Sequence, residues 1–149
     1  MTVRLANPPD IPAMMALEKD ADAAAHWPQG QYEQIFLRAG HPSRLALVIG
    51  EDAAVQGFLV ARQIDAEFEI ENVVVAGSVR RRGLGTRLVG ELLRLAHSQG
   101  AKAVFLEVRE SNRGARALYE KCGFTEIGHR KRYYQDPEEA AVLYRLDLA

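Results

Sequence analysis

Residues 67–98 decide the fold, and they read EFEIENVVVAGSVRRRGLGTRLVGELLRLAHS. The first ten alternate acidic with apolar side chains and then run into valines, which predicts a strand over 67–76. A basic glycine turn follows over 77–86, and leucines at helical spacing then predict a helix that Gly100 ends. A strand that leads through a glycine turn into a helix can hold a phosphate group.

The turn carries the groups that phosphate binding needs. The first backbone amides of a helix have no partner within it, and the helix dipole adds about half a positive charge at that end. Gly83 and Gly85 lack the Cβ atoms that would keep an anion away from these amides. Arginine side chains add forked donors that match phosphate oxygens. The expected phosphate contacts are therefore Arg80, Arg81, Arg82, Gly83, Leu84, Gly85 and Thr86.

The spacing within the turn separates the possible ligands. A dinucleotide fingerprint needs a further glycine three residues after Gly85, and a Walker loop needs a lysine, and both are missing. A solvated basic turn without a ligand and a basic patch for nucleic acid are the alternatives. The net charge of −1 and the lack of a second basic run nearby count against nucleic acid. The pattern Arg80-x-x-Gly83-x-Gly85 resembles the signature with which GCN5-related N-acetyltransferases (GNAT) hold the pyrophosphate of acetyl-coenzyme A (acetyl-CoA).

The composition is typical of a globular protein with one domain. The chain has 149 residues, of which 48% are hydrophobic, so residues 1–149 are expected to form one domain with its own core. Pro8 and Pro9 interrupt the N-terminal segment before any apolar run long enough for a signal peptide, and no apolar stretch approaches a bilayer's thickness. The single cysteine, Cys122, suits a reducing compartment. We therefore expect a soluble cytoplasmic protein.

Cysteine and histidine chemistry is not expected in the reaction. Cys122 lies at the end of a predicted helix, where the negative pole disfavours a thiolate, and no histidine is near it in the sequence. A covalent acetyl-enzyme is therefore not expected. The histidines lack the spacing of metal ligands, so no metal is expected; they are His26, His41, His97 and His129.

The rest of the chain alternates strands with helices. Further strands are predicted over residues 2–6, 45–49, 53–64, 103–108, 124–132 and 142–148. Helices are predicted over residues 11–25 and 32–40. A further helix is capped by Ser111 or Asn112 and ends at Gly123. The result is an α/β fold of one domain. Its mixed sheet is mostly antiparallel and is flanked by helices. The one parallel pair, expected at the cofactor, is formed by the strands over 67–76 and 103–108.

The strand over 67–76 needs an irregularity. Phe68 and Ile70 share one face, and simple alternation puts Val73 and Val75 on the other. A one-residue slip near Asn72 brings both pairs to the same side, and a β-bulge produces such a slip. We therefore predict a bulge that splays this strand from its parallel neighbour. The splay frees backbone groups to bind the cofactor, and these belong to Val73, Val74 and Val75.

Two further runs extend the resemblance over nearly the whole chain. Residues 106–112 (LEVRESN), with ALYE at 117–120, are similar to the GNAT superfamily at large. Residues 130–134 (RKRYY), followed by EEA at 138–140, resemble the RimI-type ribosomal-protein N-terminal alanine acetyltransferases. The resemblance implies the GNAT fold and direct transfer of an acetyl group, in a ternary complex, from acetyl-CoA to the N-terminal α-amino group of a protein. The implied acceptor begins with Ala or Ser, such as a small-subunit ribosomal protein, and the expected state is a monomer or weak dimer.

Such a reaction needs a base for the amine and an acid for the departing thiolate. Glu107 lies in an apolar strand on the face of Phe105, and the resemblance makes it the proton acceptor, acting through a water. Pairing with Arg109 or another cation is its alternative role. Tyr119 lies on the apolar face of a helix, where packing alone can account for a tyrosine. The resemblance assigns the Tyr119 hydroxyl to the coenzyme's sulfur, and Asn112 either caps its helix or bonds the pantetheine arm.

The acceptor is expected to meet Trp27, Glu71, Asn72, Tyr133 and Tyr134. Two tyrosines beside a polar loop can clamp a peptide, because each offers a flat apolar face and a hydroxyl. Ordinary edge-strand aromatics are the alternative. Relatives shape the pocket for the acceptor's first side chain where Trp27 lies, although a lone tryptophan is otherwise simply core. The segment differs here from the Phe-Pro-Trp form common in the family.

Two other functions stay open at this point. One is acetylation of a small-molecule amine or a lysine side chain, and a small amine favours an acidic pocket without a peptide groove. The other is a non-catalytic module that binds acyl-CoA without turnover.

Overall fold

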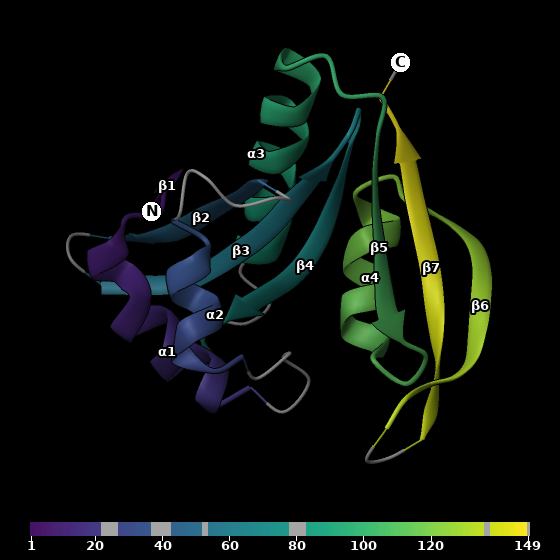
Figure 1. The fold of residues 1–149 in the computed structure, drawn as a ribbon, viewed down its shortest axis with the longest axis horizontal. Coiled ribbons are helices and arrows are strands. Elements are labelled where there is room, and N and C mark those ends of the chain that lie inside the picture. Colours follow the sequence, from purple (N-terminus) through teal and green to yellow (C-terminus); the bar gives the residue numbers. More distant parts are fainter. Residues whose placement is uncertain (22–26, 37–42, 52–53, 78–82, 136–137, 149) are drawn as a thin grey trace.

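A mixed seven-stranded sheet forms the centre of the computed structural model, which describes residues 1–21, 27–36, 43–51, 54–77, 83–135 and 138–148. The strands lie in the order β1-β2-β3-β4-β5-β7-β6 (Figure 1). All neighbouring pairs are antiparallel except β4 and β5. The strands are β1 (Thr2–Leu5), β2 (Ser43–Glu51), β3 (Ala54–Ile64), β4 (Glu67–Val75), β5 (Ala103–Arg109), β6 (Thr125–Tyr134) and β7 (Glu139–Asp147). The predicted single-domain α/β class and its one parallel pair are confirmed.

Helices cover both faces of this sheet. They are the 3₁₀ turn η1 (Pro8–Asp10) and the helices α1 (Ile11–Lys19), α2 (Gln29–Gln34), α3 (Leu84–Ser98) and α4 (Arg113–Lys121). Within the described residues no helix is long and apolar enough to cross a lipid bilayer. Gly100 and Gly123, both with positive φ, follow α3 and α4, which confirms the predicted ends of these two helices.

The first two helices differ from their predicted ranges. The helix predicted to reach residue 25 ends at Lys19, and residues 22–26 lie outside the described part. The second helix begins at Gln29, earlier than predicted, because Pro28 has the extended backbone of an N-cap. Its last helical residue is Gln34, and the predicted end near Gly40 lies outside the described residues.

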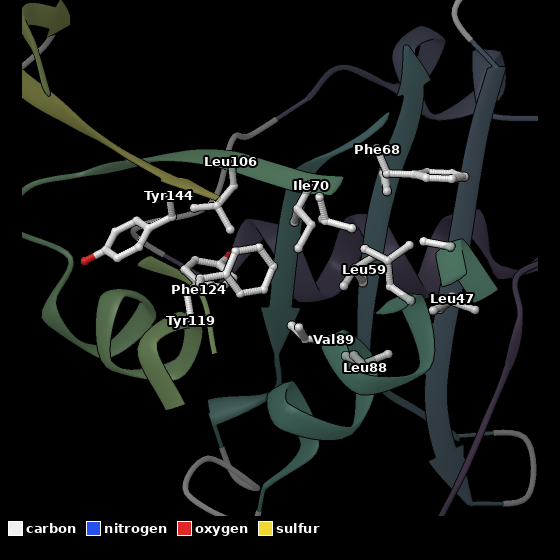
Figure 2. Packing of buried hydrophobic residues seen from close by; sticks show 14 of the residues in the cluster. Leu47, Leu59, Phe68, Ile70, Leu88, Val89, Leu106, Tyr119, Phe124 and Tyr144 are labelled. Atoms are coloured by element: carbon white, nitrogen blue, oxygen red, sulfur yellow. The ribbon is translucent and has the colours of Figure 1, made fainter. Parts of the chain in front are cut away.

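Two hydrophobic cores lie on opposite faces of the sheet. The α3-side core packs α3 and α4 on the strands, and Figure 2 shows Leu88 and Val89 of α3 against Leu59. The α1-side core packs α1 and α2 on the other face. Buried members of the α3-side core include Leu47, Leu59, Phe68, Ile70, Leu88, Leu92, Leu106, Tyr119, Phe124 and Tyr144. Buried members of the α1-side core include Met14, Tyr32, Val48, Phe58, Val60 and Val74.

The predicted bulge is present in β4. Val60 pairs with Asn72, whereas the next residue of β3, Ala61, pairs with Ile70, so Glu71 is the extra residue. The slip brings Val73 and Val75 to the α3-side core, where Phe68 and Ile70 also pack, and Val74 to the α1-side core. The predicted slip and its effect on the side-chain pattern are therefore confirmed.

The parallel pair separates soon after it begins. β4 and β5 pair from Glu67 opposite Ala103 to Ile70 opposite Leu106. Figure 1 shows the two strands side by side at their starts and apart at their arrowheads. In the described part of the sheet, the β5-facing edge of β4 beyond the bulge has no partner strand. An open wedge thus lies where the chain leaves β4 toward α3.

Several strands are longer than predicted. Gly50 and Glu51 lie beyond the predicted strand 45–49 and belong to β2, which has a register shift after Ile49. Asp52, between the two predicted strands, lies outside the described residues. Tyr133 and Tyr134 belong to β6, and Glu139 begins β7, where a polar loop was predicted. Cross-strand pairing between β6 and β7 therefore extends farther toward the wedge than the apolar pattern alone indicates.

Candidate active site

A cavity of about 560 Å³ lies between the end of β4, the start of α3 and α4. We name it the α3 cavity. Every described residue that the sequence predicts to contact the cofactor lines it, and Arg80, Arg81 and Arg82 lie outside the described residues. The predicted residues in its lining are Val73, Val74, Val75, Gly83, Leu84, Gly85, Thr86, Asn112 and Tyr119.

The start of α3 gives each of its glycines a structural role. Gly83 is the N-cap and has a φ of 76°, in the left-handed region that side chains disfavour. A Cβ on Gly85 would lie 3.1 Å from a methyl carbon of Leu118, so this glycine lets α3 approach α4. The amide of Arg87 makes the first helical bond, to the Gly83 carbonyl. The three amides before it have no helical partner, and Leu84, Gly85 and Thr86, which carry them, line the α3 cavity.

A second cavity of about 320 Å³ adjoins the first, between the splayed parts of β4 and β5. We name it the β5 cavity. Its lining includes the predicted residues Glu71, Asn72, Glu107 and Tyr134, together with Arg109. Both cavities are lined by Val73, Asn112, Ala115 and Tyr119. The two spaces therefore meet at these residues, with the start of α3 on one side and Glu107 on the other.

Glu107 faces the β5 cavity with a cation beside it. Its side chain is 15% exposed, and one carboxylate oxygen lies 3.4 Å from Nε of Arg130. The interaction of the Tyr133 hydroxyl with this carboxylate raises the pKa of Tyr133. Arg109 pairs instead with Glu139, at 3.3 Å. The alternative of an ion pair is thus realised with Arg130, a residue that the sequence analysis did not single out.

Tyr119 brings a hydroxyl to the junction of the cavities. Its ring packs edge-on against Phe124, with centroids 5.8 Å apart, and near Tyr144, at 6.3 Å (Figure 2). Burial raises the pKa of Tyr119, so the hydroxyl stays protonated at neutral pH. Among the described residues none forms a hydrogen bond with this hydroxyl. The residue is at once core and cavity wall, and its proton donor is uncommitted.

Asn112 caps α4, as one of its two predicted roles requires. Its side-chain oxygen accepts a hydrogen bond from the amide of Ala115, at 3.2 Å. Because that oxygen is engaged and the residue lines both cavities, its amide nitrogen is the group left to donate to a ligand.

The paired tyrosines lie beside Glu107 at the end of β6. Their rings are nearly perpendicular, with centroids 5.1 Å apart. Tyr134 lines the β5 cavity, and the Arg109 guanidinium lies 4.4 Å from its ring centroid. Burial raises the pKa of Tyr134 to about 12, and the charge of Glu107 adds to this rise. Tyr133 is 47% exposed and lies outside the cavity lining, with Arg130 over its ring.

Glu71 and Trp27 are held by other parts of the protein. Glu71, the bulge residue, pairs with Arg44 at 2.9 Å and lies 3.9 Å from Arg62. The Trp27 ring packs on Tyr32 at 5.6 Å and borders the α1-side core. It lines neither cavity, so the structure does not bring Trp27 together with the other predicted acceptor residues.

Sequence reasoning missed Glu18, a buried carboxylate of α1. It accepts hydrogen bonds from the Tyr32 hydroxyl, from the backbone amide of Trp27 and, at 2.6 Å, from the side-chain nitrogen of Asn72. The available signal was its position one helical turn after Met14, on the buried face of α1.

Comparison with known proteins identifies the family of this chain. The model of the acetyltransferase (GNAT) family matches residues 11–124. The ribosomal protein bS18-alanine N-acetyltransferase of Salmonella typhimurium is 31% identical over 145 residues, which is 95% of each chain. A longer protein of Mycobacterium leprae is 46% identical over 79 residues, 53% of this chain and 21% of that protein. The crystal structure of the ribosomal-protein-S18-alanine N-acetyltransferase from Escherichia coli superposes with a TM-score of 0.85 at 27% identity, covering 99% of this chain and 94% of that one. The chain therefore belongs to the acetyltransferase (GNAT) family and is an acetyl-CoA-dependent N-acetyltransferase.

Proposed function

We propose that this enzyme acetylates the N-terminal α-amino group of a protein. The observation that carries the proposal is the junction of the two cavities at Tyr119, with the start of α3 on one side and Glu107 on the other. The name of the relative from Salmonella typhimurium, which matches along 95% of this chain, supports a ribosomal-protein amine as the acceptor. Such an acceptor implies a cytoplasmic location, and we propose that the enzyme acts there as a monomer or weak dimer.

The α3 cavity suits acetyl-CoA. The amides of Leu84, Gly85 and Thr86 would bond the pyrophosphate at the positive end of α3, and Arg80, Arg81 and Arg82 would add charge. The pantetheine arm would follow the unpaired edge of β4 along Val73, Val74 and Val75, next to Asn112. A backbone amide on that edge would polarise the thioester carbonyl.

The reaction is an attack of the neutral amine on the thioester carbonyl. Glu107, which pairs with Arg130 through one carboxylate oxygen, accepts the proton that the ammonium group must lose, through a water. The carbon–nitrogen bond forms and the carbon–sulfur bond breaks. The attached nitrogen releases its second proton to solvent, and Tyr119 donates its proton to the departing sulfur and recovers one from solvent. Holding amine and thioester together supplies much of the rate.

The β5 cavity would take the acceptor's first residues. Tyr133 and Tyr134 flank it on β6, and Asn72 and Glu71 line it from the bulge of β4. Trp27 would act indirectly, by supporting the residues behind the bulge. The tyrosine faces and hydroxyls fit an extended peptide better than a small amine.

A panel of short substrates tests the acceptor class. The enzyme and acetyl-CoA are mixed with peptides that begin with Ala, Ser, Gly or Met, with an N-terminally blocked peptide that contains lysine, and with a free small amine. Mass detection should find acetylation of the free N-termini, with Ala or Ser preferred. Acetylation of only the blocked lysine peptide, or of only the small amine, would overturn the N-terminal assignment and leave the family intact.

A further inference from the structure

Glu18 is a buried carboxylate that the mechanism above does not use. It is 3% exposed, and a buried charged group is costly unless hydrogen bonds compensate it. Its three described partners come from different parts of the fold: the Trp27 backbone before α2, Tyr32 on α2 and Asn72 on β4. It therefore links α1 and α2 to the bulge, the place where β4 turns away from β5.

Each of these partners donates its hydrogen bond. The Trp27 amide and the Asn72 side-chain nitrogen can only donate, and burial together with Glu18 raises the pKa of Tyr32, which keeps that hydroxyl protonated. No cation is among the described partners of Glu18. Neutral donors thus fix the carboxylate in one geometry.

The carboxylate in turn fixes the orientation of Asn72. An asparagine amide has one donating end and one accepting end, and only the nitrogen can face a carboxylate. The oxygen Oδ1 must therefore point away from Glu18. Oδ1 has no hydrogen-bond partner among the described residues. Every fully buried side-chain polar atom of those residues has a partner, so Oδ1 is not fully buried and is open to solvent. Asn72 is 6% exposed and lines the β5 cavity, which places this oxygen at the cavity wall.

We propose that Glu18 is a positioning residue for the acceptor: through Asn72 it holds a carbonyl oxygen in the β5 cavity that accepts a hydrogen bond from the incoming amine. An ammonium group carries three N–H donors, and Glu107 needs only one of them. A second donor directed to Asn72 orients the nitrogen before the proton leaves, with no transfer to Asn72 itself. This inference rests on the proposed function, because it assigns a binding group to the same acceptor cavity.

A double-mutant cycle separates this role from support of the fold. Glu18→Gln places an amide donor against the donors of its partners, and Asn72→Ala removes the oxygen. Each change should raise the KM for the acceptor about tenfold, the effect of one hydrogen bond to a charged group, and leave the acetyl-CoA Kd within about twofold. The double variant should show no greater KM than Asn72→Ala alone, because Glu18 acts only through Asn72.

Met14→Ala is the matched control, since Met14 is buried one turn earlier on α1 and contacts neither cavity. It should lower the melting temperature at least as much as Glu18→Gln and keep the acceptor KM within about twofold. If the KM increases of the two single variants multiply in the double variant, the proposal is overturned. So would an unchanged KM in Asn72→Ala, which decides the matter even where Glu18→Gln does not fold.

The acceptor in these assays is whichever amine the unaltered enzyme acetylates in the substrate panel. An N-terminal peptide and a lysine peptide both present an ammonium group, so the cycle is informative with either. Failure of the proposed function therefore shows in the unaltered enzyme, and failure of the inference shows in the ratios between variants.

Discussion

At the scale of single residues, the arrangement around Glu107 makes the sharpest prediction. Glu107→Gln removes the proposed proton acceptor but keeps the shape of the cavity wall. The kcat should fall about a hundredfold or more, with acetyl-CoA affinity unchanged. Timed activity assays measure kcat, and calorimetry measures the affinity for acetyl-CoA. Glu110→Gln, at the exposed end of the same segment, is the control and should keep kcat within about twofold. Equal losses of kcat in both variants would contradict the proposed role of Glu107 as proton acceptor.

The tyrosines of the α3-side core should divide between catalysis and stability. Tyr119→Phe loses a hydroxyl without a described partner, so kcat should fall about tenfold or more while the melting temperature changes little. Tyr144→Phe loses hydrogen bonds to Arg116, at 3.0 Å, and to Glu120, at 2.7 Å, and Tyr144 lines neither cavity. It should lower the free energy of unfolding by about 1–2 kcal/mol and spare kcat. Thermal melts and initial rates on both variants check this division, and a reversed pattern contradicts it.

The sequence predicts those site residues whose neighbours in the chain indicate their role. Glu107 stands out as a carboxylate within an apolar strand, and Tyr119 belongs to a helix whose cap, Asn112, is readable from the sequence. Glu18 was missed because its partner Asn72 is 54 residues away in the chain. The pairing of Arg130 with Glu107 was missed for the same reason, since alternation along one strand does not say which strand lies beside it.

At the scale of the elements, the start of α3 should be sensitive to its left-handed glycine. The new methyl group of Gly83→Ala meets no atom of the described residues within 4 Å, so the expected cost is backbone strain, about 1 kcal/mol of unfolding free energy. Acetyl-CoA affinity should fall with it, because the strain is relieved by moving the first amides of α3. Gly90→Ala, also free of contacts and within the helix, should instead stabilise by about 1 kcal/mol and leave acetyl-CoA affinity unchanged. Denaturant melts measure the change in unfolding free energy of both variants, and calorimetry measures their affinity for acetyl-CoA. Changes in unfolding free energy of the same sign in the two variants would contradict the prediction.

The bulge of β4 shows what a pattern can predict about an element. Phe68, Ile70, Val73 and Val75 cannot share a face without a slip, so the irregularity follows from the positions of apolar residues. The ends of α1 and α2 were less predictable. An alanine-rich stretch favours a helix, but α1 ends at Lys19, and the Trp27 amide donates a hydrogen bond to Glu18, a contact that the local sequence does not reveal.

At the scale of the whole molecule, the tyrosines predict how stability depends on pH. The pKa is raised by burial or by neighbouring carboxylates in all of them: Tyr32, Tyr119, Tyr133, Tyr134 and Tyr144. Unfolded tyrosine titrates near about pH 10. Below that pH both states keep their protons. Above it the unfolded state loses protons first, so the free energy of unfolding should fall as pH rises beyond about 10.

Denaturant melts between pH 8 and about pH 11 measure this slope, with absorbance of tyrosinate to follow ionisation. Tyr119→Phe should make the slope shallower, because it removes one of the buried groups. A free energy of unfolding that is constant up to pH 11 would contradict the raised pKa values.

The short seam between β4 and β5 has a consequence for how such enzymes diversify. Only four residue pairs join the two strands, from Glu67 and Ala103 to Ile70 and Leu106. The sheet thus consists of two groups of strands, β1–β4 and β5–β7, joined along this one seam, with the end of β4 lining the α3 cavity and the paired tyrosines on β6. Because so few residue pairs cross this seam, substitutions on β6 and β7 can accumulate with little effect on the pairing within β1–β4.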